Sequence, residues 1–380
     1  MSKIFALLMI KNESATIRYS LKSLNNKVDN VYIYDTGSTD DTIKICKEFE
    51  NVVIAHGPWV NFEVSRNAAL EWVESQVPSH SWVLLMDSND ELRGDLRKAL
   101  SSREADKVAC GVQQLWESTS STSINKVLRI IKTGEGWRYK YPVHEFLYIQ
   151  GNASPRCSFA QDICLFQNRK RDIGKTLSRN DWDIAVLKSE IEKYPADTRL
   201  VFYLANTYFN KKMWEFAKKM YEKRISMQGV NDDTETKWEC YKAMLRCGHV
   251  HAIGLQDASN AVAYFIQASS YSEKCGEFLV DGLIEAGRIY RQIGHFKLAY
   301  MCLDYSTQYS PPENHPTGID LTLFHFTRWN ELAFTAWQLG KIKEGKQACK
   351  KAMNSEYGEP DVARCNMDWI EKSQTSELGS

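Results

Sequence analysis

The first ninety residues alternate short apolar runs with segments of helical periodicity. The runs are almost continuously apolar, as buried parallel strands are, and they cover residues 3–10, 30–34, 51–55 and 81–86. The helical segments between them cover residues 14–25, 39–49 and 63–74. This β-α-β-α-β-α-β order predicts an α/β fold, a Rossmann-like and mostly parallel sheet with helices on both faces. Such sheets bind ligands beyond the carboxyl ends of their strands.

From about residue 176 the pattern changes to apolar residues at helical spacing. A weak repeat places a small residue, an aromatic residue three positions later, and a second small residue twelve positions after the first. It is seen from Ala205 through Ala217, from Gly287 through Ala299 and, degraded, from Ala333 through Gly345. This small-and-large alternation lets antiparallel helices pack closely and predicts an all-α, tetratricopeptide-like domain. We therefore expect domains at 1–175 and 176–372 and a disordered tail at 373–380.

Composition excludes some classes of partner. Lys plus Arg and Asp plus Glu both number 48, so the net charge is zero, which disfavours nucleic acid and anionic membranes as partners. No uncharged run reaches the length of a membrane span, and we expect a cytoplasmic protein with reduced cysteines. Cys240 and Cys247 lie near His249 and His251, but their spacing matches no common zinc module, which disfavours zinc there.

Polar side chains follow the second strand and open the third helical segment. Asp35, Ser38 and Asp40 stand between a strand and a helix, where carboxylates can accept from a ribose hydroxyl or a base N–H. The alternative is a turn with a helix cap. Arg66 lies near a helix start and could offer its planar fork to a phosphate; the alternative is a solvated helix arginine.

Acidic residues follow the fourth strand. Asp87, Asn89 and Asp90 come directly after SWVLLM, and their oxygens are ligands that Mg²⁺ or Mn²⁺ prefers. The alternative is a polar turn that caps the next helix. Further on, His144 and Glu145 could be a metal ligand beside a general base, although a lone strand histidine is more often structural.

Taken together and in this order, these motifs resemble family 2 glycosyltransferases with the GT-A fold, in the branch that carries C-terminal tetratricopeptide repeats. The resemblance rests on Lys11-Asn12-Glu13, DTGSTDDT at 35–42, Arg66-Asn67, WVLLMDSNDEL at 82–92 and Val143-His144-Glu145. It extends to helical segments at 199–208, 290–300 and 329–337.

The resemblance implies an inverting transfer of a sugar from a nucleotide-sugar donor, with UDP as the expected nucleotide, to a hydroxyl of a glycan or protein. The residues expected to bind the donor are Asn12, Glu13, Asp35, Ser38, Asp40 and Arg66. Those expected to hold Mn²⁺ or Mg²⁺ are Asp87, Asn89 and His144. Glu145 or Asp90 would be the catalytic base. The helical repeats would bind a partner protein, the acceptor or a second copy of the chain.

Two departures from the family pattern keep other functions open. Asn89 stands where the family has a second Asp, and an amide ligates a metal without adding charge. Either Asp90 takes the place of a metal ligand, or metal binding is weaker, or the enzyme is impaired. The α/β part is also short for this fold. One alternative is a tetratricopeptide scaffold on an inactive α/β domain. Another is a nucleotidyltransferase, which the absence of a glycine-rich loop at 11–14 disfavours.

Overall fold

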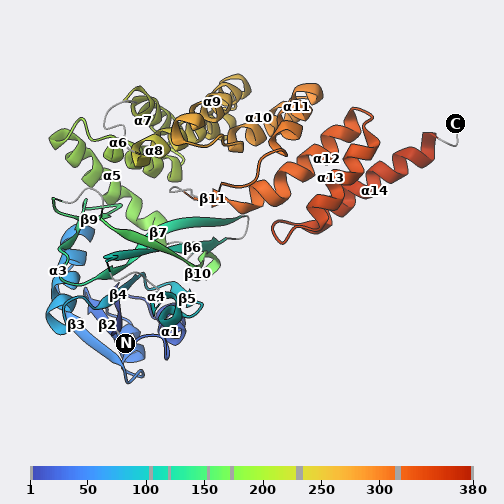
Figure 1. The fold of residues 1–380 in the computed structure, drawn as a ribbon. Helices are drawn as coiled ribbons and strands as arrows, with labels where there is room; N and C mark the ends of the chain where they lie inside the picture. The colour runs from blue at the N-terminus through green and yellow to red at the C-terminus, as the bar shows by residue number, and fades with distance from the viewer. Residues whose placement is uncertain are drawn as a thin grey trace. The chain divides into compact units, whose positions relative to one another are not determined.

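The computed structural model describes residues 3–101, 106–118, 121–151, 155–171, 175–227, 234–312 and 318–377. The chain divides into two compact units. Unit 1 comprises Met1–Ser118 and Ile124–Ile173, and unit 2 comprises Thr119–Ser123 and Gly174–Ser380. Unit 1 is an α/β unit and unit 2 is helical, which is the fold class that the sequence predicts (Figure 1).

The main sheet of unit 1 has its strands in the order β3-β2-β1-β4-β7-β6-β10-β5. The strands are β1 (Ile4–Ile10), β2 (Asn30–Asp35), β3 (Val52–His56), β4 (Trp82–Met86), β5 (Asp90–Arg93), β6 (Ala109–Glu117), β7 (Thr122–Lys132) and β10 (Cys157–Asn168). The four predicted strands, β1 to β4, pair in parallel, and so do β6 and β10. Strands β4 and β7 are antiparallel, as are β10 and β5. A separate antiparallel pair consists of β8 (Trp137–Lys140) and β9 (Phe146–Ile149).

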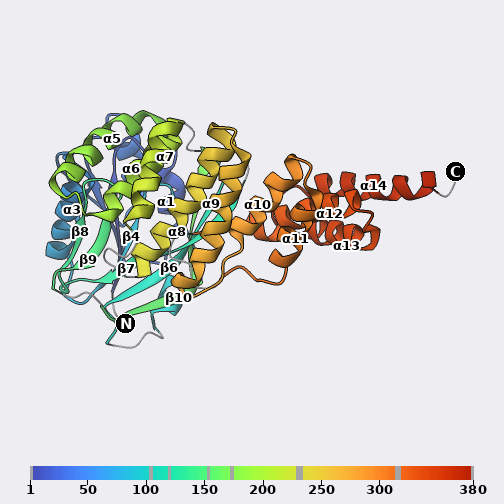
Figure 2. The ribbon, with the colours of Figure 1, turned by 90° about the horizontal axis from the view of Figure 1, so that it is seen from above.

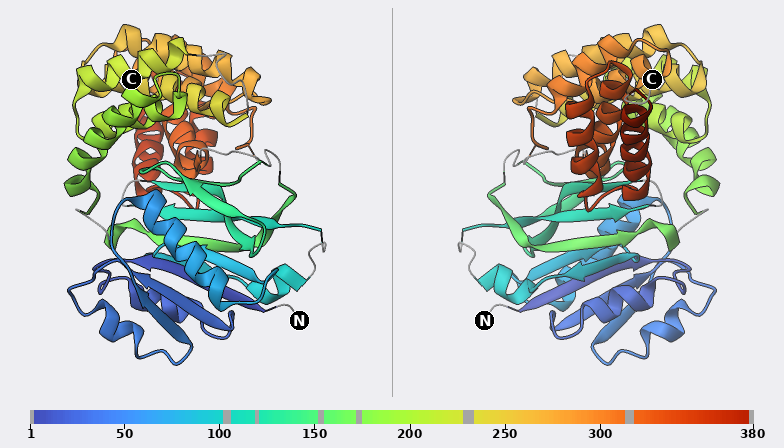
Figure 3. Two further views of the ribbon diagram at one scale, coloured as in Figure 1. Left: turned by 90° about the vertical axis from the view of Figure 1, so that its left-hand side faces the viewer. Right: turned by 90° about the vertical axis from the view of Figure 1, so that its right-hand side faces the viewer.

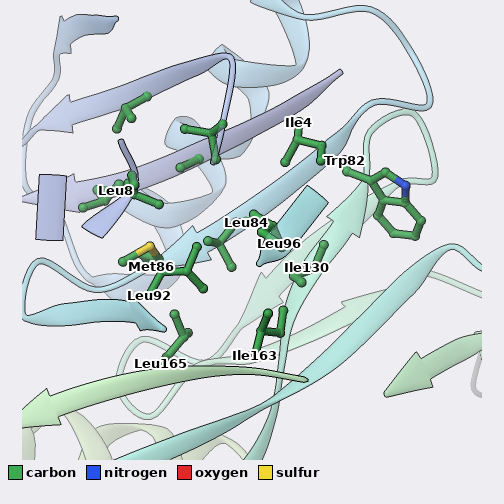
Figure 4. Close-up of a cluster of buried hydrophobic side chains, with 14 of the residues drawn as sticks. Ile4, Leu8, Trp82, Leu84, Met86, Leu92, Leu96, Ile130, Ile163 and Leu165 are labelled. Atoms are coloured by element: carbon green, nitrogen blue, oxygen red, sulfur yellow. The ribbon is translucent and has the colours of Figure 1, made fainter. Parts of the chain in front are cut away.

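Helices cover both faces of this sheet, which explains why its first strands are apolar on both sides. Alternate residues of β1, such as Ile4 and Leu8, join the core beneath α1 (Ile17–Ser23), α2 (Thr42–Cys46) and α4 (Leu96–Ser101), part of which Figure 4 shows. The residues between them, such as Phe5 and Leu7, join the opposite core. That core packs against β8 and against α3 (Phe62–Gln76), which crosses this face of the sheet in Figure 3.

The parallel register brings the carboxyl ends of three strands together. Leu8 of β1 lies opposite Met86, the last residue of β4. Ile10, the last residue of β1, lies opposite Asp35, the last residue of β2. The polar residues that follow these strands are therefore neighbours at one edge of the sheet, where a ligand is expected.

Unit 2 is a succession of helices, which Figure 2 shows in chain order from green to red. The helices are α5 (Lys175–Lys193), α6 (Thr198–Asn210), α7 (Trp214–Ser226), α8 (Thr234–His249), α9 (Ala258–Tyr271), α10 (Asp281–Gln292), α11 (Phe296–Ser306), α12 (Arg328–Gln338), α13 (Ile342–Met353) and α14 (Pro360–Glu377). Unit 2 also contains a two-residue strand, β11 (Ile319–Asp320), π-helical turns at Val250–Gly254 and Leu323–Thr327, and a 3₁₀ turn at Ser272–Cys275; another 3₁₀ turn, Arg169–Arg171, lies near the end of unit 1. Each helix packs mainly on its neighbours in sequence.

The small residues of the predicted repeat lie where these helices approach each other. Ala205, Ala217 and Ala299 are completely buried. A Cβ added to Gly287 of α10 would lie 2.6 Å from Cγ of Leu303 in α11, so the two helices leave no room there for a larger side chain.

The last helix of unit 2 extends almost to the end of the chain. Helix α14 continues to Glu377, within the segment 373–380 for which the sequence predicts disorder. Extending an existing helix adds one hydrogen bond for each residue fixed, which lets a polar segment continue it. The remaining residues, 378–380, lie outside the described part. Among the described residues, no helix combines the length and apolarity needed to span a bilayer.

Candidate functional site

The loop after β2 is organised around a buried carboxylate. The side chain of Asp35 is 4% exposed. Its Oδ1 accepts hydrogen bonds from the hydroxyl of Ser38 (2.6 Å) and from the backbone N–H of Ser38 (3.0 Å). Its Oδ2 lies 3.1 Å from Nδ1 of His56, whose side chain is 66% exposed. The half-buried Ser38 of this loop and the exposed His56 at the end of β3 thus both contact the buried Asp35 carboxylate.

Hydrogen bonds join this loop to the one that follows β1. The backbone N–H of Asn12 donates to the Ser38 hydroxyl (3.0 Å), and Oδ1 of Asn12 accepts from the backbone N–H of Thr39 (2.7 Å). Asn12 has a φ of 54°, a left-handed conformation that asparagine tolerates better than most residues. The backbone N–H of Glu13 donates to the hydroxyl of Thr42 (2.7 Å). The two predicted donor-binding loops therefore form one connected surface.

Asp40 also belongs to this connection rather than standing free. Its Oδ2 accepts from the backbone N–H of Ser14 (3.1 Å), and its Oδ1 accepts from the backbone N–H and the hydroxyl of Thr42. Burial acts to raise the pKa of Asp40, but these hydrogen bonds outweigh it and lower the pKa to about 2. The carboxylate thus helps to hold the start of α2 against the loop after β1.

A second cluster surrounds Asp87, directly after β4. Its Oδ1 accepts from a terminal guanidinium nitrogen of Arg66 in α3 (2.7 Å), and its Oδ2 accepts from one of Arg129 in β7 (2.9 Å). Burial acts to raise the pKa of Asp87, but Arg129 and Arg66 outweigh it and hold the pKa below its usual range. Each oxygen of this carboxylate therefore faces a guanidinium group.

Arg66 also reaches Glu145, so one guanidinium joins two acids. Its Nε lies 2.5 Å from Oε1 of Glu145, and both side chains are less than 20% exposed. Beside Arg66, the side chain of Asn67 bonds to the backbone of Tyr139 in β8 twice, accepting from its N–H (2.7 Å) and donating to its carbonyl (2.9 Å). These two hydrogen bonds hold α3 against β8, the strand that lies just before Glu145 in the sequence. Arg66 further lines a small pocket with Leu7, Met9, Leu85 and Tyr139.

Asp90 supports this cluster from inside the protein. It is fully buried; its Oδ2 accepts from the backbone N–H of Asp87 (2.9 Å), and its Oδ1 accepts from the side-chain amides of Gln167 (2.8 Å) and Gln114 (3.2 Å). Burial, and then the charge of Asp87, raise the pKa of Asp90 to about 6. Because both oxygens are engaged and none is exposed, the structure argues against the catalytic role predicted for Asp90. The carboxylate shapes the turn that presents Asp87.

The residues predicted to hold a metal do not fit a divalent ion in this arrangement. Asn89 and His144 are half-buried and contribute no negative charge when the imidazole is neutral. Asp87 supplies the charge, but a cation at either of its oxygens would lie beside a guanidinium. The chemistry that suits two converging guanidinium groups is instead a phosphate or diphosphate, which they can bind through several N–H donors.

Sequence reasoning found most of this cluster and missed Arg129. The predicted residues Arg66, Asp87 and Glu145 are brought together from α3, the end of β4 and the turn before β9. Arg129 stands among apolar residues in KVLRII, and a charged residue inside a strand of this kind was the available signal. Its partner Asp87 lies 42 positions earlier, which only the antiparallel pairing of β4 with β7 reveals.

Part of the chain matches a known protein family. Residues 6–164 match the family model described as glycosyl transferase family 2. Unit 1 is a glycosyltransferase family 2 domain. All the predicted site residues, from Asn12 to Glu145, lie within the matched part of this domain.

Relatives with curated descriptions match parts of the chain. An uncharacterized glycosyltransferase of Rickettsia felis is 33% identical over 97 residues, which are 26% of this chain and 32% of that protein. A TPR repeat-containing protein of Synechococcus elongatus is 24% identical over 150 residues, which are 39% of this chain and 36% of that protein. The chain thus spans about a third of the length of these relatives. Among solved structures, the TPR protein YrrB is similar over 50% of this chain and 85% of its own, at 15% identity and a TM-score of 0.35.

Proposed function

We propose that the family 2 domain transfers a sugar from a nucleotide-sugar donor, with UDP as the first nucleotide to test, to a hydroxyl group of a glycan or protein acceptor, with inversion. The observation that supports this most directly is the pair of arginines, Arg66 and Arg129, that converge on Asp87 at the ligand-binding edge of the sheet. A nucleotide sugar carries a diphosphate, and two guanidinium groups suit its charge and shape.

In this proposal the donor lies across the two clusters. Its nucleoside contacts the connected loops after β1 and β2, where the Ser38 hydroxyl and the Asn12 backbone are within hydrogen-bond distance of each other. Its diphosphate takes Arg66 and Arg129 away from Asp87. The same guanidinium groups then stabilise the negative charge that develops on the leaving nucleoside diphosphate.

Glu145 is the proposed base. It removes the proton from the acceptor hydroxyl, whose oxygen forms a bond to the anomeric carbon while the bond from that carbon to the diphosphate oxygen breaks. Attack from the face opposite the leaving group inverts the configuration. In the structure Glu145 is paired with Arg66. A diphosphate that binds Arg66 would therefore release the base that the reaction needs.

The sequence also predicts a Mn²⁺ or Mg²⁺ ion held by Asp87, Asn89 and His144. As arranged, these residues do not offer Asp87 to a cation, so we derive no step through a metal. The variant Asp87→Asn separates the two uses of this carboxylate. If Asp87 holds an ion, donor affinity falls in the variant. If Asp87 only occupies the arginines, donor affinity rises or stays the same.

Ligand-dependent thermal stability tests the proposal on the full chain. UDP- and GDP-sugars are screened with wild type, Arg66→Ala and the control Arg138→Ala, each with Mn²⁺ and with a chelator. Arg138 is also an arginine of unit 1, but it pairs with Glu71 and Glu74 and is 33% exposed. A donor at 100 times its Kd stabilises the folded protein by about 2.7 kcal/mol, which gives a clear melting shift.

We expect one nucleotide sugar to raise the melting temperature of wild type and of Arg138→Ala but not of Arg66→Ala. That donor is then used to assay transfer and hydrolysis. If no donor shifts wild type and none is hydrolysed, the proposal is refuted. The alternative, a helical scaffold on an inactive domain, is then favoured, and Asn89 in place of a second carboxylate agrees with it.

A further inference from the structure

A second group of side chains with metal-ligand chemistry lies in unit 2, outside the proposed glycosyltransferase site. It consists of Glu222 in α7, Cys247 in α8 and His251 in the π-helical turn that follows α8. The carboxylate oxygen, the thiol sulfur and the imidazole nitrogen that these residues offer all lie within 4.8 Å of one another. Among the described residues, this is the only such group with three or more His, Cys, Asp or Glu side chains.

The backbone explains why Cys247 and His251 face the same way. They are four residues apart on a continuous helical path, so both side chains project from one face. The path widens into a π-helical turn at Val250–Gly254, where the N–H of Leu255 bonds to the carbonyl of Val250 (3.0 Å). Turns of this kind are rare in proteins, and those that occur are frequently part of a functional site.

The imidazole of His251 is buried, and its neighbour Asp257 is poorly aligned for a hydrogen bond with it. The residue is 5% exposed, and neither ring nitrogen has a hydrogen-bond partner of good geometry. Nδ1 lies 3.3 Å from Oδ2 of Asp257. Metal-bound histidines almost always direct their second ring nitrogen to a carboxylate or carbonyl in this way, which fixes the ring for the metal.

The surroundings separate this group from bulk water on one side. Cys247 is completely buried, and Tyr264 stacks its ring on that of His251, with centroids 5.3 Å apart and planes at 24°. The hydroxyl of Tyr264 lies 3.3 Å from Oε1 of Glu222. Glu222 itself is exposed, so an ion could enter from the side of α7 and keep a water ligand there.

We propose that Glu222, Cys247 and Nε2 of His251 bind one zinc ion, with Asp257 orienting the imidazole. A thiolate, an imidazole and a carboxylate are the ligands that zinc takes, and a water completes the tetrahedron. Mg²⁺ and Ca²⁺ prefer oxygen ligands alone, so the thiolate disfavours them. The ion would join α7 to the end of α8 and stabilise the π-helical turn. The sequence alone disfavours zinc near Cys247 and His251 because their spacing matches no common zinc module. That spacing could not reveal the third ligand, Glu222, which comes from the preceding helix.

Zinc content and zinc affinity of the full-length protein test this site. The purified protein is stripped with a chelator, titrated with Zn²⁺ alone and analysed for bound metal after desalting. Co²⁺ is then used as a spectroscopic probe, because a tetrahedral site with a thiolate gives visible bands and a charge-transfer band from sulfur. The variants are Cys247→Ser, Glu222→Gln and Asp257→Asn. The matched controls are Cys240→Ser, a buried thiol on the same helix, and Glu215→Gln, an exposed carboxylate on α7.

We expect one equivalent of zinc in wild type and in both controls. Cys247→Ser should lose the charge-transfer band and the bound zinc, and Asp257→Asn should weaken binding about 10- to 100-fold. Glu222→Gln changes an exposed residue, so it tests the site even if Cys247→Ser does not fold. If wild type retains no zinc, the proposal is wrong. If zinc binds with the same affinity in wild type, Glu222→Gln and Asp257→Asn, the metal is adventitious only and the proposal is also wrong.

Discussion

Substitution of Arg129 tests both the ion pairs around Asp87 and the proposed binding of the donor diphosphate. The substitution Arg129→Ala removes the guanidinium that faces Oδ2 of Asp87 and leaves Arg66 as the remaining cation beside that carboxylate. Two quantities should change together. The folded protein loses an ion pair, and the proposed donor loses one of the two groups that would bind its diphosphate.

The magnitudes follow from burial. Breaking a fully buried ion pair by removing one partner costs about 3–5 kcal/mol. Here the side chain of Asp87 is 28% exposed and keeps Arg66, and that of Arg129 is 18% exposed, so we expect a loss of roughly 1–2 kcal/mol in the free energy of unfolding. A hydrogen bond to a charged group contributes about 1.5–3 kcal/mol, so donor affinity should fall about 10- to 100-fold.

The loss of stability should also depend on pH with a definite sign. Arg129 and Arg66 hold the pKa of Asp87 below its usual range, against the effect of burial. Stability from a carboxyl of depressed pKa is present above its unfolded pKa of about 3.9 and is lost as the pH falls below it. The difference between wild type and Arg129→Ala should therefore be full at pH 7 and shrink as the pH falls through the pKa that Asp87 has in the folded variant, where Arg66 alone faces it.

Urea unfolding at pH 7 and pH 3, with donor titrations at pH 7, measures these effects. Arg138→Ala is the control, because its ion pairs are more exposed and should contribute less than about 1 kcal/mol. If Arg129→Ala unfolds at the same urea concentration as wild type, the ion pair contributes no stability. If it binds the donor as well as wild type, Arg129 does not bind the diphosphate, and the proposed donor position is wrong.

Three further substitutions test other parts of the molecule. Glu145→Gln should reduce the rate of sugar transfer at least 100-fold and should not lower donor affinity in titrations, because it frees Arg66 of a competing carboxylate; an unchanged rate would remove Glu145 as the base. Hydrogen bonds hold the pKa of Asp40 at about 2, so its stabilising effect is lost as the pH falls from about 4 toward 2; acid unfolding of Asp40→Asn should depend less on pH over this range. Gly282→Ala would place a Cβ 2.1 Å from the carbonyl oxygen of Phe265 and should cost about 1–3 kcal/mol in urea unfolding, more than Gly345→Ala, whose nearest contact is 3.2 Å.

The sequence predicted the first half of the sheet because its signal is local. Strands β1, β2 and β4 are buried on both faces, so their residues form continuous apolar runs that stand out between helical segments, and β3, at the edge of the sheet, is apolar except for its last residue. The later strands are less uniform: in β7 and β10, buried residues mix with half-buried and exposed ones. Such strands carry no apolar run that a single sequence would reveal.

The site shows the same limit at the level of side chains. The sequence shows that acids cluster after β4, but it does not show which way each side chain points. Asp90 turns inward because β5 begins there and because Gln114 and Gln167, from β6 and β10, donate to its carboxylate. Asp87 turns toward Arg129 through the pairing of β4 with β7. Each of these partners is distant in sequence, so composition and spacing cannot separate the acid that faces the ligand from the acid that supports it.

The two acids and two arginines of the cluster around Asp87 neutralise one another. Asp87 and Glu145 carry two negative charges, and Arg66 and Arg129 carry two positive ones, joined in a chain by contacts of 2.5–2.9 Å. A charge-balanced chain of this kind offers little to a neutral sugar. A diphosphate, in contrast, competes directly for both guanidinium groups. Because Arg66 holds Glu145 as well as Asp87, the anion that displaces one acid displaces the other, and donor binding would itself free the base.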